Sequence, residues 1–199
     1  MYYLKGQKKC GHGDCRSAAL FGADHCAAHL DDVQAWRESI REMVHNRQNF
    51  AGANFEKADL SGLGFALGHF EQANFSGANL KETNLEGAHI EGARFDSADL
   101  SEANLCGAHG EFAIFGGAVM DGAQCTGADF RRANFVGTRG HGANFRQAEF
   151  YYSRPGAADF QKADFSEASI MRAIFRKADL RGANFKGATG SANFEDAIR

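Results

Sequence analysis

Four residues near the start of the chain have the types and the spacing of a metal site. Cys10 and Cys15 are separated by four residues, and Cys26 and His29 are separated by two. Two close pairs joined by a short spacer can supply the four ligands of a tetrahedral Cys₃His zinc site. Because four protein ligands fill the coordination shell of zinc, we expect the Zn²⁺ ion to be structural and not catalytic.

The C-x4-C-x10-C-x2-H pattern resembles small zinc knuckles of plants and bacteria. The spacing leaves other interpretations open. His12 or His25 could replace one of the ligands. The cysteines could also be unligated, or Cys10 and Cys15 could form a disulfide. Residues 1–30 are too few to bury an apolar core without a staple. We therefore expect metal removal to unfold residues 1–30 and to leave the rest of the chain folded.

A five-residue unit repeats without a slip from Phe50 to Phe185. One position of the unit is bulky and apolar in most copies, and a small residue, usually alanine, precedes it by two positions. A period of five matches neither the 3.6 residues of a helical turn nor the 2.0 of a flat strand, but is typical of a solenoid. Two irregularities are visible. Pro155 occupies an inward position, where it predicts a local bulge, and the repeat loses one residue after Gly190.

The repeated A-(D/N)-(L/F)-x-x pattern resembles the pentapeptide-repeat family over roughly the last three-quarters of the chain. The resemblance implies an all-β solenoid, namely a right-handed quadrilateral β-helix with four repeats per coil and about seven coils here. Its bulky and small residues would both point inward. We accordingly divide the chain into a zinc-knuckle-like segment (residues 1–30), a capping helix (31–49) and the β-helix (50–199).

The capping helix is the one convincing helix of the sequence, and Asp31 or Asp32 can cap its N-terminus. Its apolar face is defined by residues at helical spacing: Val33, Trp36, Ile40 and Met43. A solenoid must cover its first coil, because an open end exposes apolar core and unpaired backbone. We predict that this face packs over Phe50, Phe55 and Leu60.

Four repeats per coil would stack residues twenty positions apart, so each outward face can be followed along the rod. One face would carry a histidine column and a glutamate column: His69, His89 and His109; Glu71, Glu91 and Glu111. The same face continues with large side chains: Phe112, Arg131, Arg132, Tyr151, Tyr152 and Arg172. Exposed aromatic residues indicate a contact surface, so we predict that this face binds an unidentified protein partner.

The sequence leaves two other interpretations of this face open. The stacked histidines and glutamates could serve only to solvate the rod, with the aromatic residues covering a bulge near Pro155. Metal binding by the histidine column is the weaker interpretation, because ligands stacked along one line are poorly placed around a tetrahedron.

Charge changes sign along the repeats. Residues 50–125 are mainly acidic, whereas arginine and lysine dominate from residue 126 onward. That polarity could steer a partner. The quinolone-resistance branch of the family, whose rods mimic DNA and occupy type II topoisomerases such as gyrase, is an alternative implied by the resemblance. A DNA mimic needs acidic charge along its whole length, but only residues 50–125 are mainly acidic here. We therefore favour this alternative less.

Nucleic-acid binding is a second alternative, through the zinc knuckle and the basic C-terminal half. Lys5, Lys8, Lys9 and Arg16 form a basic group, but only Tyr2 and Tyr3 supply stacking aromatics. We therefore do not expect a nucleic-acid partner. The sequence contains no G-x-S-x-G motif, phosphate loop or paired carboxylates in a cleft, and a packed rod offers no pocket, so we do not expect an enzyme.

The sequence thus predicts a non-catalytic protein-binding or scaffold solenoid with a structural zinc site. No apolar run reaches the ~20 residues of a membrane span, and the N-terminus lacks the apolar core of a signal peptide. Without an export signal, we expect the five cysteines to be reduced thiols or metal ligands. We therefore expect a cytoplasmic protein without membrane contact. Because no helix follows the last repeats to cover them, we expect a homodimer through the C-terminal coils.

Overall fold

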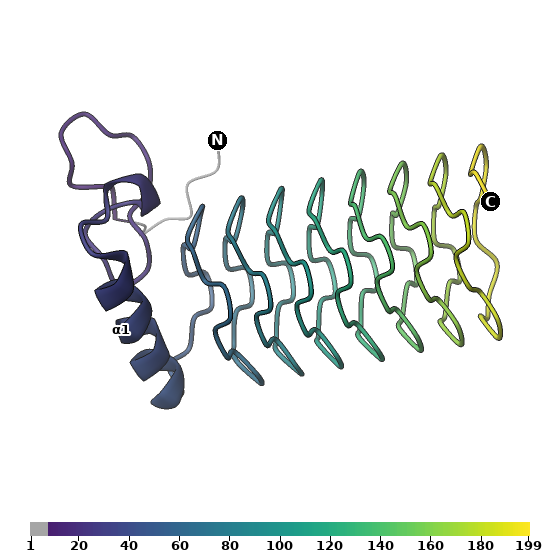
Figure 1. The fold of residues 1–199 in the computed structure, drawn as a ribbon, viewed down its shortest axis with the longest axis horizontal. Helices are drawn as coiled ribbons and strands as arrows, with labels where there is room; N and C mark the ends of the chain where they lie inside the picture. Colours follow the sequence, from purple (N-terminus) through teal and green to yellow (C-terminus); the bar gives the residue numbers. More distant parts are fainter. Residues whose placement is uncertain (1–7) are drawn as a thin grey trace.

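A computed structural model describes residues 8–199 of the chain. These residues form a rod of stacked coils, with the helix α1 lying across one end and the C-terminus at the other (Figure 1). Three residues of the predicted nucleic-acid patch (Tyr2, Tyr3 and Lys5) lie outside the described residues. Lys8, a fourth member, is in contact with the carboxylate of Asp24.

The coils are joined by parallel bridges between residues twenty positions apart. Asn54 pairs with Asn74, for example, and Asn74 pairs in turn with Arg94. One coil therefore contains four five-residue repeats. Each repeat contributes a single bridge residue followed by a turn, so the β-structure is a set of isolated bridges and not of long strands.

The repeat Asn74–Ala78 shows how the sequence produces this geometry. The N–H of Asn74 donates to Ala53 O of the preceding coil at 2.9 Å, and the N–H of Phe75 donates to Arg94 O of the following coil at 2.7 Å. A turn closed by the hydrogen bond from Ala78 N to Phe75 O at 2.9 Å then changes the chain direction. The backbone polar groups are thus satisfied between coils, which frees the bulky side chain to point inward.

The corner residue of each turn has a left-handed backbone conformation, with a positive φ. Gly77 has a φ of 67°, as expected for glycine, but Phe112 has a φ of 62° at the equivalent position. Non-glycine residues adopt this conformation at many corners, among them Lys57, Gln72, Glu82, Tyr152 and Arg172. The corner therefore favours glycine without requiring it.

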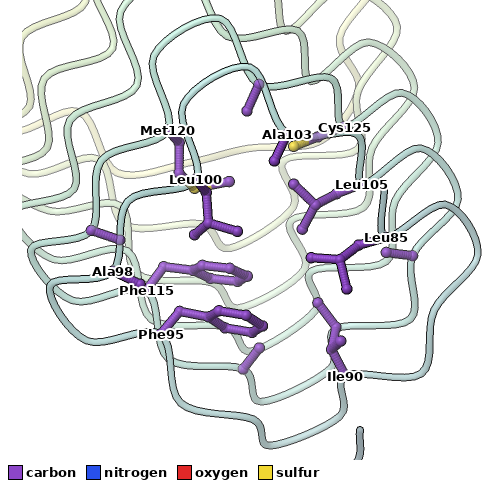
Figure 2. Packing of buried hydrophobic residues seen from close by; sticks show 14 of the residues in the cluster. Leu85, Ile90, Phe95, Ala98, Leu100, Ala103, Leu105, Phe115, Met120 and Cys125 are labelled. Carbon is purple, nitrogen blue, oxygen red and sulfur yellow. The ribbon is translucent and has the colours of Figure 1, made fainter. Parts of the chain in front are cut away.

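The interior is a set of stacked columns. Phe95 and Phe115 lie parallel with their ring centres 4.9 Å apart, and both are fully buried (Figure 2). Small buried residues such as Ala98 and Ala103 alternate with the large ones and keep the cross-section constant. Full burial of one bulky side chain contributes about 1.5–3 kcal/mol, so the repeated columns stabilise the rod without a ligand.

The prediction of a bulge at Pro155 is wrong. The bridges from Asn134 to Arg154 and from Asp159 to Asp179 keep the twenty-residue step on both sides of the proline. At the proline itself, Arg154 and Ile174 form no bridge, because proline has no N–H to donate. The shortened repeat after Gly190 does change the step, which falls to nineteen between Ile174 and Asn193.

The first coil is covered by α1, which spans Val33–His45. Asp32 caps the helix by accepting a hydrogen bond from Ala35 N at 2.9 Å. Trp36 and Ile40 are buried against the coil, and Met43 packs at the edge of the same cluster. Val33 differs from the prediction, because it is 37% exposed. Since it shares the helix face of Ile40, its exposure reflects its place in the first turn, at the end of the contact.

The cysteine segment also contributes to the cover of the first coil. Leu20 is buried in the core cluster, and Phe21 N donates to Asn54 O at 2.8 Å. Trp36 Nε1 donates to Phe21 O at 2.9 Å and so joins the segment to α1. The N-terminal segment and α1 therefore form one cap over the rod.

Candidate functional site

Cys10, Cys15, Cys26 and His29 come together at the N-terminal end of the rod. The four donor atoms all lie within 4.8 Å of one another. His29 Nδ1 is 3.5 Å from Cys10 Sγ and 3.4 Å from Cys26 Sγ, and the sulfurs of Cys15 and Cys26 are 3.9 Å apart. Around a tetrahedral zinc ion, the usual bond lengths place a sulfur and a nitrogen about 3.5 Å apart and two sulfurs about 3.8 Å apart. The four side chains therefore lie close enough to bind one metal ion.

Short backbone contacts hold these four residues in place. Cys15 N donates to His12 O at 3.0 Å and closes the first turn, in which Gly13 has a φ of 45°. Cys26 is the N-cap of the 3-10 helix η1, which spans Ala27–His29, and His29 N donates to Cys26 O at 2.9 Å. Cys26 and His29 thus come from one turn, whereas Cys10 precedes the turn from His12 to Cys15 and donates its N–H to Ser17 O at 3.0 Å.

The surroundings of the thiols affect their protonation. Burial raises the pKa of Cys10, but hydrogen bonds from the backbone N–H groups of Cys26 and His12 and the contact with His29 outweigh it and lower the pKa to about 6. Burial raises the pKa of Cys26, and the neighbouring Cys10 and Cys15 sulfurs add to that rise. Cys10 is thus held toward the thiolate, which is the form that binds a metal.

The two alternative histidines occupy different positions. His12 stacks on the ring of His29 with the centroids 4.0 Å apart, so it packs against a member of the cluster. His25 lies beside Gly11, at 3.5 Å from the position that a Cβ atom would take there. Neither belongs to the group of four close donors.

The histidine column forms on the side of the rod. The rings of His69 and His89 stack at 4.7 Å, and those of His89 and His109 stack at the same distance. Nδ1 of His69 lies 2.9 Å from Glu71 Oε1, and Nδ1 of His89 lies 3.4 Å from Glu91 Oε1. Burial raises the pKa of Glu71, but hydrogen bonding to His69 and the charges of His69 and His89 lower it overall.

Two carboxylates of the glutamate column each have one oxygen atom that is buried without a hydrogen-bond partner in the described part of the chain. Oε2 of Glu71 and Oε2 of Glu91 are buried and have no hydrogen-bond partner among residues 8–199. A buried carboxylate oxygen without a partner is costly. Farther along the rod the acidic side chains have cationic partners: Arg131 lies 3.6 Å from Glu111 and donates to Asp129 at 2.6 Å.

Aromatic and arginine residues alternate on the neighbouring corner. We call Phe112, Arg132, Tyr152 and Arg172 the aromatic–arginine column, because they follow one another at steps of twenty residues. Phe112 is 53% exposed and Tyr152 is 40% exposed. The guanidinium carbon of Arg132 lies 5.3 Å from the Phe112 ring centre, and that of Arg172 lies 5.0 Å from the Tyr152 ring centre. Tyr151 is half-buried and packs edge-on against Tyr152.

Two hollows lie near the ends of the rod. One has a volume of 580 Å³ and is lined by residues of the C-terminal end of α1 and of the first coil, among them His45, Arg47 and His69. The other has a volume of 320 Å³ and is lined by inward residues of the last coils, among them Leu180 and Phe194. The middle of the rod is packed with buried side chains.

Sequence reasoning missed three residues of the cap: Arg37, Leu20 and Phe21. Arg37 is four positions after Val33 and three before Ile40, so helical spacing places it within the apolar arc. Leu20 and Phe21 are adjacent large apolar residues in the spacer between the two ligand pairs. Both patterns are visible in the sequence, but neither shows which surface these side chains pack against.

The bridges and inward columns define a β-solenoid with a Cys/His cluster at its capped end. A family model described as pentapeptide repeats matches residues 73–109, 123–154 and 156–188, in eight copies. The matched segments cover just over half of the chain, which therefore belongs to the pentapeptide-repeat family. The predicted family and the predicted β-solenoid are thus confirmed.

Several solved structures are similar to this chain. HetL, a pentapeptide repeat protein involved in heterocyst differentiation regulation in the cyanobacterium Nostoc sp. strain PCC 7120, is 22% identical with a TM-score of 0.28, over 81% of this chain and 93% of HetL. QnrB1, a plasmid-mediated fluoroquinolone resistance protein, is 26% identical with a TM-score of 0.40, over 74% of this chain and 68% of QnrB1. Rfr23, a pentapeptide repeat protein of the cyanobacterium Cyanothece 51142, is 18% identical with a TM-score of 0.29, over 82% of this chain and 98% of Rfr23. No curated protein sequence matches the chain.

Residues 8–199 contain the helix α1 and the short 3-10 helix η1. Within that range, no helix is both long enough and apolar enough to cross a bilayer.

Proposed function

We propose that this chain is a non-catalytic scaffold whose rod binds a protein partner along one face. The observation that carries the proposal is the aromatic–arginine column, in which two large aromatic side chains remain exposed on a rod that buries most others. Tyrosine and arginine are enriched among the residues that dominate binding energy at protein interfaces. A rigid backbone also keeps the entropy loss on binding small.

The charges near this column indicate the kind of partner. Arg132 lies 3.9 Å from the nearest carboxylate oxygen, that of Glu111, and Arg172 contacts the Tyr152 hydroxyl. Both guanidinium groups also lie over aromatic rings, which orients them without neutralising them. The partner would therefore present acidic side chains next to an apolar or aromatic residue.

A structural Zn²⁺ ion in the Cys₃His cluster belongs to this proposal. The ion would be held by Cys10, Cys15, Cys26 and His29, whose separations fit a tetrahedral site. It would close the turns that carry Leu20 and Phe21 onto the first coil. The ion would thus stabilise the capped end of the rod and take no part in a reaction.

We also propose that the last coil associates with a second copy of the chain. The inward residues Phe185 and Phe194 are only partly buried, whereas equivalent residues in the middle of the rod are fully buried. They line the 320 Å³ hollow at that end. Joining two such ends would bury apolar surface and satisfy backbone groups at once. Sedimentation at micromolar concentration tests this: we expect a dimer for the wild type and a monomer for Phe194→Glu, and a monomeric wild type would contradict the proposal.

The DNA-mimic and nucleic-acid alternatives have less support. Acidic residues outnumber basic ones only in the first half of the repeats, while a DNA mimic needs an acidic surface along the whole rod. The cytoplasmic location stays a prediction from the sequence.

The binding proposal is tested with the full chain as bait for proteins of a cell lysate, quantified by mass spectrometry. Phe112→Asn and Tyr152→Asn remove the aromatic rings, and asparagine tolerates the left-handed φ of 62° and 56° at these corners. We expect the combined variant to lose a bound partner at least about tenfold. The control is Val136→Ala, which changes an exposed apolar residue on a different face. Equal retention of every partner by the wild type and the combined variant would contradict the proposal.

A further inference from the structure

We propose that His69, Glu71 and His89 form a second metal site, which binds a divalent transition-metal ion on the side of the rod. The site is separate from the Cys₃His cluster and uses only nitrogen and oxygen donors. It lies on the first two coils, where the histidine and glutamate columns run side by side.

The three donor groups are already close together. One ligand atom from each of His69, Glu71 and His89 lies within 4.8 Å of the others. The two imidazole rings are parallel within 5° and 4.7 Å apart, because the bridge between His69 and His89 fixes their backbones in register. Small side-chain rotations would bring the donors to the separations that an ion with bonds of about 2.0–2.2 Å requires.

The donor types point to a transition metal and not to calcium or magnesium. Imidazole suits zinc, copper, nickel and iron, whereas calcium and magnesium prefer sites made only of oxygen ligands. Two histidines and one glutamate are a known donor set for zinc with a further position left for water. The proposed site therefore differs from the closed Cys₃His cluster in having room for an exchangeable ligand.

The unpartnered oxygen of Glu71 is the second observation that supports a cation here. Oε1 of Glu71 contacts His69, but Oε2 is buried and has no hydrogen-bond partner within residues 8–199. A bound cation would compensate this oxygen, which is otherwise costly to bury. Because Glu71 lies two residues after His69 on the same coil, it approaches the histidine column from the side.

The sideways position of Glu71 overcomes the geometric limitation that the sequence predicts for a metal site in the histidine column. Histidines stacked along one line cannot surround an ion by themselves. The third donor in this structure comes from an adjacent column, so the three ligands do not lie on one line.

The equivalent trio on the next coil, His89, Glu91 and His109, is less suited to a cation, because it is not among the groups of described residues whose donor atoms all lie within 4.8 Å of one another. Glu111 lies 3.6 Å from Arg131 and 3.9 Å from Arg132, and these guanidinium groups compete with a metal ion for the carboxylate. His109 therefore provides a matched control, because it stacks on His89 at the same 4.7 Å spacing.

The test uses the full chain with the Cys₃His cluster saturated by one equivalent of zinc. Cobalt(II) is then added and followed by its visible absorption, and native mass spectrometry counts the ions on each chain. We expect one further ion, whose spectrum lacks the near-ultraviolet thiolate charge-transfer band. His69→Ala and His89→Ala should each weaken its binding at least about tenfold, as should Glu71→Gln. His109→Ala should leave it within about twofold.

All four substitutions are on the outside of the rod, and circular dichroism checks that each variant is folded. Absence of a second ion in the wild type at several equivalents of cobalt would overturn the proposal. Undiminished binding in the combined His69→Ala and His89→Ala variant would also overturn it, since the ion would then bind elsewhere. A thiolate band accompanying the second ion would contradict it for the same reason.

Discussion

The guanidinium group of Arg37 in α1 is joined to Asp59 of the first coil in two ways. Nη1 donates to the backbone carbonyl of Asp59 at 2.7 Å and lies 3.1 Å from its carboxylate oxygen Oδ2. Nη2 donates to the carbonyl of Ser61 at 2.6 Å. Arg37 is only 7% exposed, so this charged side chain replaces neighbouring-coil hydrogen bonds at the capped end.

We predict that Arg37→Ala lowers the free energy of unfolding by roughly 2–3 kcal/mol, because it removes charge-assisted bonds and leaves buried carbonyl groups unpaired. Urea unfolding followed by circular dichroism measures the change. The control is Arg41→Ala on the same helix, where an exposed pair with Glu38 is lost and a change below about 0.5 kcal/mol is expected. Similar losses in the two variants would contradict the assigned role of Arg37.

Acid should weaken the same contact. Burial raises the pKa of Asp59, but hydrogen bonds from Ser61 and the charge of Arg37 lower it overall below its ordinary value of 3.8. A carboxylate with a lowered pKa in the folded state stabilises the fold above its ordinary pKa, and this contribution is lost as the pH falls through the lowered value. We therefore expect the melting temperature to fall more steeply below about pH 4 in the wild type than in Asp59→Asn. Asp31→Asn, at an exposed site before α1, should keep the wild-type slope.

Phe115 and Phe112 belong to the same coil but should respond differently to substitution. Phe115 is fully buried and stacks on Phe95 at 4.9 Å and on Phe135 at 4.8 Å. We expect Phe115→Ala to lower the free energy of unfolding by about 3–5 kcal/mol, since it leaves a cavity in a continuous column. Phe112→Asn should change it by less than about 1 kcal/mol, because this side chain is on the outside. Denaturant unfolding compares them, and equal effects would disprove the inward and outward assignment.

Metal removal should affect more than the cysteine segment. Leu20 is buried in the core cluster, and Asn54 Nδ2 donates to Ala19 O at 2.9 Å. We expect chelation to raise amide hydrogen exchange in residues 8–30 and also in the first coil, with the last coils unchanged, because each coil contacts only its neighbours. Hydrogen-exchange mass spectrometry before and after chelation measures this.

Two cysteine variants provide the controls for metal removal. Cys26→Ser should reproduce the chelated pattern, because it removes one of the four close donors. Cys106→Ser lies outside the cluster and should retain the wild-type pattern. Unchanged exchange in the first coil on chelation would show that the cap does not depend on the metal.

Much of the fold follows from the sequence because the repeat is local. Each five-residue unit specifies its own inward residue and its own turn, so the columns through Phe95 and Phe115 could be predicted from spacing alone. The same regularity placed His69, His89 and His109 in one column. The pairing of Cys10 and Cys15 with Cys26 and His29 was also visible as two close pairs of ligands.

The tertiary structure decided everything that depends on contacts between segments without a common period. No rule in the sequence shows that Arg37 is buried against Asp59, or that Leu20 and Phe21 pack on the first coil. The missing N–H of Pro155 also predicted a bulge, but the contacts of adjacent coils keep the register there. The closeness of Glu71 to two histidines likewise depends on side-chain rotamers, which periodicity does not determine.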